Sequence, residues 1–250
     1  MKTVHLYREN IRNGALILVN RNHPMKEDTD ISLMPVDMAY KDICMESKAS
    51  VILTKLIEAL GAKGEIIPVS GYRTKREQEG IYRDSLKENG NEFTEKYVAL
   101  PNCSEHQTGL AIDLGENQDF IDFIRPEFPY TGICGEFRNK ASLYGFIERY
   151  EKGKEKITGI SHEPWHFRYV GYPHSQMMKT NHMSLEEYIQ YIKNFPYEGK
   201  HYFLKEESRM IEVFYVSGDS DRTTIELPEN DLFQVSGNNV DGFIVTLWRR

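Results

Sequence analysis

Two short stretches of this chain constrain it most, because together they contain the residue types that a metal site requires. Residues 104–113 read Ser-Glu-His-Gln-Thr-Gly-Leu-Ala-Ile-Asp, and residues 163–166 read Glu-Pro-Trp-His. A catalytic zinc site typically has three protein ligands and leaves a fourth position open for water. The candidate ligands are two imidazoles and one carboxylate, from His106, Asp113 and His166.

The spacing within the first stretch indicates its backbone. Residues 109–114 alternate small and large side chains, which predicts a strand with Asp113 on the face of the small residues. His106 lies seven positions before Asp113, an odd offset that a straight strand would place on the opposite face. We therefore expect a turn near Thr108 and Gly109, where glycine permits the necessary conformation.

The second stretch carries a candidate catalytic base. Glu163 lies three residues before His166, an offset that fits a turn or a helix and not a regular strand. Pro164 removes a backbone donor, so we expect an irregular entry into a strand that begins near Trp165. Taken alone, this pair and the His106/Asp113 pair are weak signals, and the interpretation depends on their conjunction.

Two neighbours of His106 have simpler interpretations. Glu105 would point away from the His106 side on an extended backbone, so we interpret it as a solvated carboxylate. The chain has an odd number of cysteines without zinc-type spacing, at Cys44, Cys103 and Cys134. We expect free thiols, and a small buried hydrophobe is the simplest role for Cys103.

The composition narrows the class of protein. A chain of 250 residues is long enough for one large domain, or for one domain and a small module. The net charge of −7 and the lack of a basic tract argue against nucleic-acid binding. The apolar run at residues 15–19 is too short for a signal or an anchor. We therefore expect a cytoplasmic protein without a membrane span.

Hydrophobic periodicity and capping signals predict the main elements. Helices are expected over 47–60, 75–89, 137–144 and 184–195, with Gly90 ending the second. Strands are expected over 14–19, 66–69, 146–150 and 165–170. Residues 116–128 are predicted as a helix or an inserted lid.

The pattern of residue types changes after residue 197. Short β-rich runs, separated by stretches of Gly, Asp and Asn, occur at 211–216, 223–227, 232–235 and 242–248. We therefore divide the chain into a domain of residues 1–197 and a small β-rich module of residues 198–250. The module is either an extension of the main sheet or a unit that binds a partner.

A third stretch, Ser-Gly-Tyr-Arg-Thr at residues 70–74, lies at a predicted strand-to-helix junction. Thr74 and Glu77 fit a capping box, so the helix should begin directly after Thr74. Arg73 is then either a surface cation paired with an acid or a functional residue. In a zinc peptidase a fixed cation stabilises the oxyanion that develops on the scissile carbonyl.

These three motifs, at 70–78, 104–113 and 163–171, together resemble the zinc D,D-peptidases that cut D-Ala-D-Ala. The chain looks closest to the Van-type D,D-dipeptidase/D,D-carboxypeptidases of glycopeptide resistance, the bifunctional VanXY kind. The resemblance covers roughly residues 14–195. It implies an α+β fold in which helices pack on a central, mainly antiparallel sheet that carries the zinc, and it leaves the β-module outside.

The resemblance also implies a role for each site residue. His106, Asp113 and His166 would bind one Zn²⁺ per chain. Glu163 would be the catalytic base, and Arg73 would polarise the carbonyl. The implied substrate contacts are Gln78 and Ser104, near the terminal carboxylate, together with Ser70 and Trp165.

The expected activity is hydrolysis of D-Ala-D-Ala and removal of the terminal D-Ala of the muramyl-pentapeptide precursor, giving vancomycin-type resistance. Because water attacks directly, Ser104 need not be a nucleophile. One alternative is a peptidoglycan endopeptidase of the same superfamily, such as a phage-type endolysin that cuts an L,D bond. Another is a non-catalytic zinc-bearing binding module, as the hedgehog signalling domains resemble, and the presence of both Glu163 and Arg73 counts against it.

Overall fold

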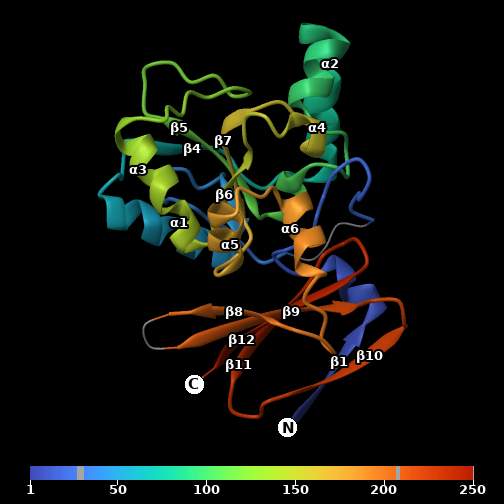
Figure 1. The fold of residues 1–250 in the computed structure, drawn as a ribbon. Helices are drawn as coiled ribbons and strands as arrows, with labels where there is room; N and C mark the ends of the chain where they lie inside the picture. The colour runs from blue at the N-terminus through green and yellow to red at the C-terminus, as the bar shows by residue number, and fades with distance from the viewer. Residues whose placement is uncertain (27–30, 207–208, 250) are drawn as a thin grey trace. The chain divides into compact units, whose positions relative to one another are not determined.

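A computed structural model describes residues 1–26, 31–206 and 209–249 (Figure 1). The chain divides into two compact units. Unit 1 comprises Met1–Leu18 and Leu185–Arg250, and unit 2 comprises Val19–Ser184. This grouping differs from the division at 197/198 that the sequence predicts, because the N-terminal strand pairs with a strand of the β-rich segment.

Unit 2 is built around a four-stranded antiparallel sheet in the order β4-β5-β7-β6. Its strands are β4 (Ile66–Ser70), β5 (Ala111–Glu116), β7 (Glu163–Tyr169) and β6 (Phe146–Tyr150). The pairing places Asp113 of β5 opposite both Ser70 of β4 and His166 of β7. The predicted α+β class with a central antiparallel sheet is confirmed.

Helices and short connecting elements complete unit 2. They are β2 (Leu33–Pro35), β3 (Cys44–Glu46), α1 (Ser47–Leu60), α2 (Lys75–Tyr97), η2 (Glu105–Thr108), α3 (Gly132–Ala141), η3 (Ser142–Tyr144), α4 (Glu155–Thr158) and α5 (His174–Thr180). Helices α1 and α3 lie together beside the sheet (Figure 1). Buried aromatic rings from α3, β6 and β7 form much of the core, at Phe137, Phe146 and Phe167.

Helix α2 begins at Lys75 with the predicted capping box, in which Thr74 and Glu77 each accept a backbone N–H of the other. The first helical segment ends at Gly90 as predicted, but a second segment that was not predicted follows it directly. Gly90 takes a left-handed conformation (φ 77°) that kinks the helix, and the chain then re-enters helix as far as Tyr97. The hydroxyls of Ser85 and Thr94, 2.8 Å apart, join the two helical segments across the kink.

Two further predictions are corrected. Residues 15–19 are buried, but they form no strand. The backbone N–H groups of this segment do not pair with a neighbouring strand. The Leu16 N–H donates to Ser236 Oγ, and the Leu18 N–H donates to the Asn238 carbonyl. The strand prediction was wrong because a buried apolar run does not by itself specify a strand.

Residues 117–128 are not helical. The carboxylate of Asp122 accepts the backbone N–H groups of Ile124 and Arg125, which closes a local turn and competes with helix formation. The segment ends against the sheet, where the Glu116 N–H donates to the Glu127 carbonyl. It is a loop, and helix α3 starts at Gly132, five residues before the predicted start.

Unit 1 is rich in β-structure. Strand β1 (Lys2–Tyr7) pairs with β10 (Arg222–Leu227), and a second antiparallel sheet has the order β11-β12-β9-β8. These strands are β11 (Leu232–Gly237), β12 (Gly242–Arg249), β9 (Met210–Ser217) and β8 (Tyr202–Lys205). Unit 1 also contains the short helices η1 (Arg8–Arg12), which follows β1, and α6 (Leu185–Ile192), which precedes β8. The four predicted β-rich runs are confirmed, whereas β1 and β8 were not predicted.

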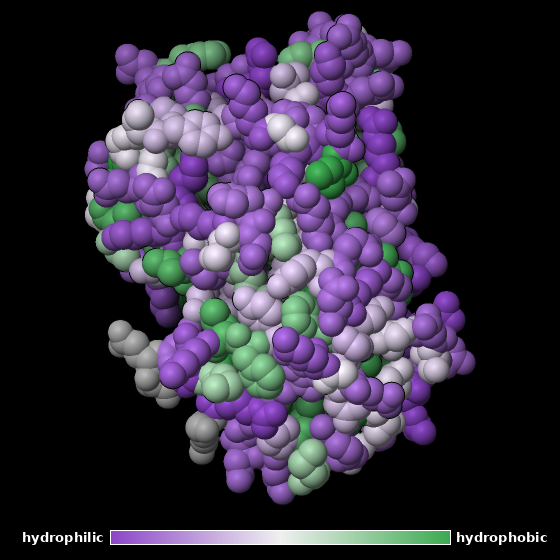
Figure 2. Space-filling model, in the orientation of Figure 1, coloured by the Kyte–Doolittle hydropathy of each residue, from purple (hydrophilic) through white to green (hydrophobic). Residues whose placement is uncertain are grey.

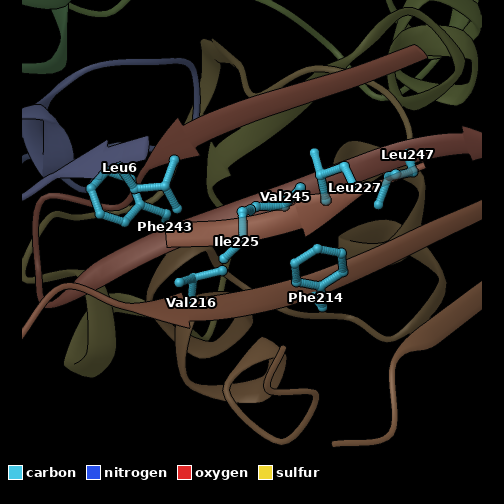
Figure 3. Close-up of a cluster of buried hydrophobic side chains, with 8 residues drawn as sticks. All are labelled: Leu6, Phe214, Val216, Ile225, Leu227, Phe243, Val245 and Leu247. Carbon is cyan, nitrogen blue, oxygen red and sulfur yellow. The ribbon is translucent and has the colours of Figure 1, made fainter. Parts of the chain in front are cut away.

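Unit 1 contains a buried cluster of apolar side chains. Its buried members, drawn in Figure 3, are Leu6, Phe214, Val216, Ile225, Leu227, Phe243, Val245 and Leu247. They come from β1, β9, β10 and β12, so both sheets of unit 1 contribute to one cluster.

The face of the molecule drawn in Figure 2 is mainly hydrophilic, with hydrophobic side chains in small scattered groups. Across the described ranges, no helix combines the length and the apolar character that crossing a membrane requires.

Candidate metal centre

Asp113 of β5 lies at the centre of the candidate site. Its Oδ2 atom lies 3.1 Å from His106 Nε2, and its Oδ1 atom lies 2.9 Å from His166 Nδ1. All three side chains are buried. One possible ligand atom from each lies within 4.8 Å of the others, so the three residues that the sequence singles out do meet.

The turn before β5 brings His106 to Asp113. Residues Glu105–Thr108 form a short 3₁₀ helix, and Gly109 follows in the left-handed region with φ 69°. A Cβ at Gly109 would also lie 3.0 Å from the Glu46 backbone nitrogen, so glycine suits this corner in two ways. The turn expected near Thr108 and Gly109 is thus present.

An irregularity between β6 and β7 brings Glu163 beside His166. Glu148 pairs with Phe167, but Tyr150 pairs with Glu163, so the register shifts between the two pairs. β6 advances by two residues between these pairs and β7 by four, and an irregularity of this kind re-aims side chains at the end of a strand. Glu163 Oε2 consequently lies 3.8 Å from His166 Nδ1. The irregular entry is confirmed, although β7 already begins at Glu163.

The two histidines are held in the cluster through different ring atoms. His106 Nδ1 lies 2.7 Å from the Gly71 carbonyl oxygen. A carbonyl only accepts, so this contact requires the proton on Nδ1 and leaves the Nε2 lone pair facing Asp113. Burial lowers the pKa of His106 to about 4, with the Arg73 cation acting in the same direction, so the ring is neutral at pH 7.

His166 shows that the cluster favours a positive charge. Burial alone would lower its pKa, but the hydrogen bond to Asp113 and the nearby Glu105 and Glu163 carboxylates raise it to about 9. The carboxylates that favour an imidazolium ion here would equally favour a divalent cation. Two imidazoles and one carboxylate are a common ligand set for catalytic zinc, so the residues present fit this metal.

Glu163 is a buried carboxyl group at the edge of the cluster. Burial raises its pKa to about 8, against the lowering effect of His166 and of the Arg73 cation. A general base works best when its pKa is near the operating pH. Its position and its environment therefore suit proton transfer.

Arg73 is hydrogen-bonded to Asp113 and to two further side chains. Its Nη2 atom donates to Asp113 Oδ2 at 3.0 Å, its Nε atom to Ser70 Oγ at 2.9 Å, and its Nη1 atom to Gln78 Oε1 at 3.3 Å. Gln78 is fixed in turn, because its amide nitrogen donates to the Ala99 carbonyl. Two of the predicted substrate contacts, Ser70 and Gln78, thus hold the guanidinium in place.

The cluster opens into a pocket that Arg73, Gln78, Ser104, Glu163 and Trp165 line together with the three candidate ligands. Sequence analysis missed several apolar lining residues, among them Tyr97, Phe123, Tyr150 and Ile160. Phe123 belongs to the loop that was predicted as a helix or a lid, and the Arg73 guanidinium lies 5.8 Å from its ring centroid. The apolar character of that loop was the available signal.

Glu105 is not the solvated carboxylate that the sequence predicts, since it is 1% exposed. The 3₁₀ turn directs it inward, where its Oε1 atom lies 2.8 Å from Arg149 Nε and 2.9 Å from Arg168 Nη1. Burial would raise the pKa of Glu105, but the two guanidiniums and His166 hold it well below its usual range. Each of the two arginines has an aromatic neighbour in the sequence of a buried strand, and this pattern could have indicated a buried ion pair.

Fold and site together define a zinc-peptidase class of protein, with a buried carboxylate and a fixed cation beside three candidate ligands. The VanY profile, described as D-alanyl-D-alanine carboxypeptidase, matches residues 42–172. The chain is 44% identical over 181 residues to the bifunctional D-Ala-D-Ala dipeptidase and carboxypeptidase VanXYC of Enterococcus gallinarum, an alignment that spans 72% of this chain and 95% of the relative. The chain belongs to the VanY family.

Two solved structures extend this result. The vancomycin-resistance D,D-dipeptidase VanXYg, crystallised with a D-Ala-D-Ala phosphinate analogue, is 54% identical with a TM-score of 0.97, and 99% of each chain is covered. Its similarity includes the β-module that the sequence resemblance left outside. The D,D-pentapeptidase VanY of a VanB-type cassette, solved with Zn(II), is 31% identical with a TM-score of 0.57 over 70% of this chain and 98% of that one. That relative and the His-Asp-His cluster support a zinc site here.

Proposed function

We propose that this chain is a zinc-dependent D,D-dipeptidase and D,D-carboxypeptidase. It hydrolyses D-Ala-D-Ala and removes the terminal D-Ala of the muramyl-pentapeptide precursor. The observation that carries the proposal is one pocket in which Glu163 and Arg73 flank the three candidate ligands. The similarity to VanXYC and VanXYg supports the choice of substrate.

His106, Asp113 and His166 would hold one zinc ion per chain. The ion, when bound, supplies Lewis acidity that activates water and polarises a carbonyl group. Glu163 accepts a proton from the attacking water and passes it to the amine nitrogen of the leaving D-Ala. Arg73 stabilises the negative charge that develops on the carbonyl oxygen, and its bonds to neighbouring side chains keep it oriented for that purpose.

Ser104 and Trp165 are proposed to contact the substrate, because both line the pocket. Gln78 combines this role with its bond to Arg73. Ser70 is proposed to act mainly through Arg73, to which it is hydrogen-bonded.

Alanine release from D-Ala-D-Ala and from the pentapeptide precursor, with and without a chelator, tests the activity. Both substrates should yield D-Ala, and chelation should abolish the release. Glu163→Gln should retain zinc and lose roughly 10²–10⁴-fold in turnover. Lysis of intact cell wall without release of D-Ala would instead identify an endopeptidase, and zinc binding without any turnover would identify a binding module.

We further propose that the enzyme acts in the cytoplasm and confers vancomycin-type resistance. The support is that all three cysteines are free thiols, as is usual in a reducing compartment. Removing D-Ala-D-Ala and the precursors that end in it would leave only precursors with an altered terminus. Fractionation of cells that make the native protein tests the location, and recovery outside the cytoplasm would contradict it.

A further inference from the structure

The two candidate histidine ligands differ in what holds the ring nitrogen that faces away from Asp113. For His106 this atom is Nδ1, which contacts the neutral Gly71 carbonyl. For His166 it is Nε2, which faces Glu105 Oε2 at 3.6 Å. One imidazole is thus held by a backbone dipole, and the other lies against a carboxylate.

The atoms of the second contact have no alternative partner. His166 Nε2 and Glu105 Oε2 are both buried, and within the described part of the chain neither has a hydrogen-bond partner. The other oxygen of Glu105 lies between Arg149 and Arg168, both of which are fully buried. A buried donor and a buried acceptor that face each other would each remain unsatisfied unless they pair.

The charges explain why this carboxylate is available as an acceptor. Two guanidiniums at 2.8 and 2.9 Å favour the ionised form of Glu105, which only accepts hydrogen bonds. An imidazole that binds a metal through one nitrogen usually donates its other N–H to a carboxylate, a carbonyl or water, which fixes the tautomer and raises the basicity of the ligand.

We propose that Glu105 is a positioning residue: it accepts the Nε2 proton of His166 and so presents Nδ1 to the metal, while Arg149 and Arg168 hold its carboxylate for that contact. The inference rests on the proposed zinc site. It assigns control over the affinity and geometry of one ligand to a buried charged triad, none of whose members is a proposed substrate contact.

The first test uses the unaltered protein. Long-range ¹H–¹⁵N NMR of the zinc-loaded chain reports which ring nitrogen of each histidine carries a proton, and the spectrum of His166→Gln identifies the His166 signals. A protonated Nε2 and an unprotonated Nδ1 are expected. A proton on Nδ1 of His166 would overturn the proposal, whatever the behaviour of any variant.

The second test is the zinc affinity of Glu105→Gln, measured by competition with a chelator. An amide keeps the volume of the side chain, but its single oxygen cannot serve both the arginines and His166. The expected loss of affinity is roughly 10- to 100-fold. An affinity within twofold of the wild-type value would contradict the proposal.

Glu212→Gln is the matched control. Glu212 is also buried, and it pairs with one arginine and one histidine, Arg249 and His201, in unit 1. Its substitution removes a comparable charged contact and should leave zinc affinity unchanged. Neither test uses a peptide substrate. The expected tautomer and affinity without hydrolysis of D-Ala-D-Ala would therefore refute only the proposed function.

Discussion

The two four-stranded antiparallel sheets of this protein each contribute to a buried cluster, and the two clusters differ in chemistry. In unit 2, strands β5 and β7 bury Asp113, Glu163 and Arg168 around the metal cluster. In unit 1, the buried cluster that β9 and β12 share is apolar, with Phe214 and Phe243 as its largest members. Apolar burial is non-directional, whereas a buried charge is tolerated only when specific partners surround it.

This difference separates stability from chemistry. Removing a core side chain of unit 1 should weaken folding and leave metal binding unchanged. Removing a charged side chain from the unit 2 cluster should alter the reaction or the metal site more than it alters folding. The following predictions test that contrast, from the largest expected effect to the smallest.

Phe214→Ala should reduce the free energy of unfolding of unit 1 by about 3–5 kcal/mol, because it leaves a cavity in the apolar core. Urea unfolding measures the change, and zinc affinity should stay at the wild-type value. Phe203→Ala, at a half-exposed site on β8, is the control and should cost much less. Loss of zinc affinity with unchanged stability would break the contrast.

Arg73→Ala should lower kcat/KM for D-Ala-D-Ala by roughly 10²–10³-fold, or about 2.7–4 kcal/mol of transition-state stabilisation. The zinc content should be retained, since Arg73 is not a ligand. Arg76→Ala, at an exposed position in the first turn of helix α2, should behave like the wild type. Activity of Arg73→Ala within twofold of wild type would refute the role of this cation.

His174 is a buried ionisable group of unit 2 that lies outside the metal cluster, so it provides a further test of the contrast. Burial lowers its pKa to about 3, below the ordinary value of 6.5, so the unfolded chain binds the proton first. Stability is therefore complete above pH 6.5 and falls as the pH drops toward 3, by on the order of 3 kcal/mol at pH 4.

Thermal unfolding between pH 7 and pH 4 tests this prediction. His174→Gln should show a flatter decline, whereas His182→Gln, at an exposed position, should keep the wild-type slope. An unchanged slope in the first variant would show that His174 does not contribute to acid sensitivity.

Thr74→Ala should cost about 1 kcal/mol, because it removes the side chain that caps helix α2 next to Arg73. Thr74→Ser keeps the hydroxyl and should stay close to wild type in urea unfolding. If the alanine variant lost zinc instead of stability, the cap would belong to the metal cluster and not to the helix.

Much of the candidate site could be predicted because its chemistry lies in residue type and spacing. Residue type and spacing indicated His106, Asp113 and His166 as candidate ligands and Glu163 as the candidate base, whereas the family resemblance implied the role of Arg73. The turn at Gly109 followed from an odd offset, and the irregular start of β7 followed from Pro164. For these two backbone features a local rule was sufficient.

The parts that the sequence did not predict depend on distant partners. Glu105 is buried against Arg149 and Arg168, which reach it from strands β6 and β7. Residues 15–19 are as apolar as a strand, but their donors pair with side chains and loops near the opposite end of the sequence. The same holds for β1, whose partner is β10, and short-range periodicity contains no information about such pairs.

The pairing of β1 with β10 has a consequence for synthesis. Lys2 lies opposite Leu227, so every residue of unit 2 leaves the ribosome between the two strands. Until β10 has been translated, the backbone of β1 is an unsatisfied edge that exposes its N–H and C=O groups to other chains. Nascent chains arrested before β10 should accordingly depend on chaperones, because the first strand of unit 1 can be satisfied only by one of the last.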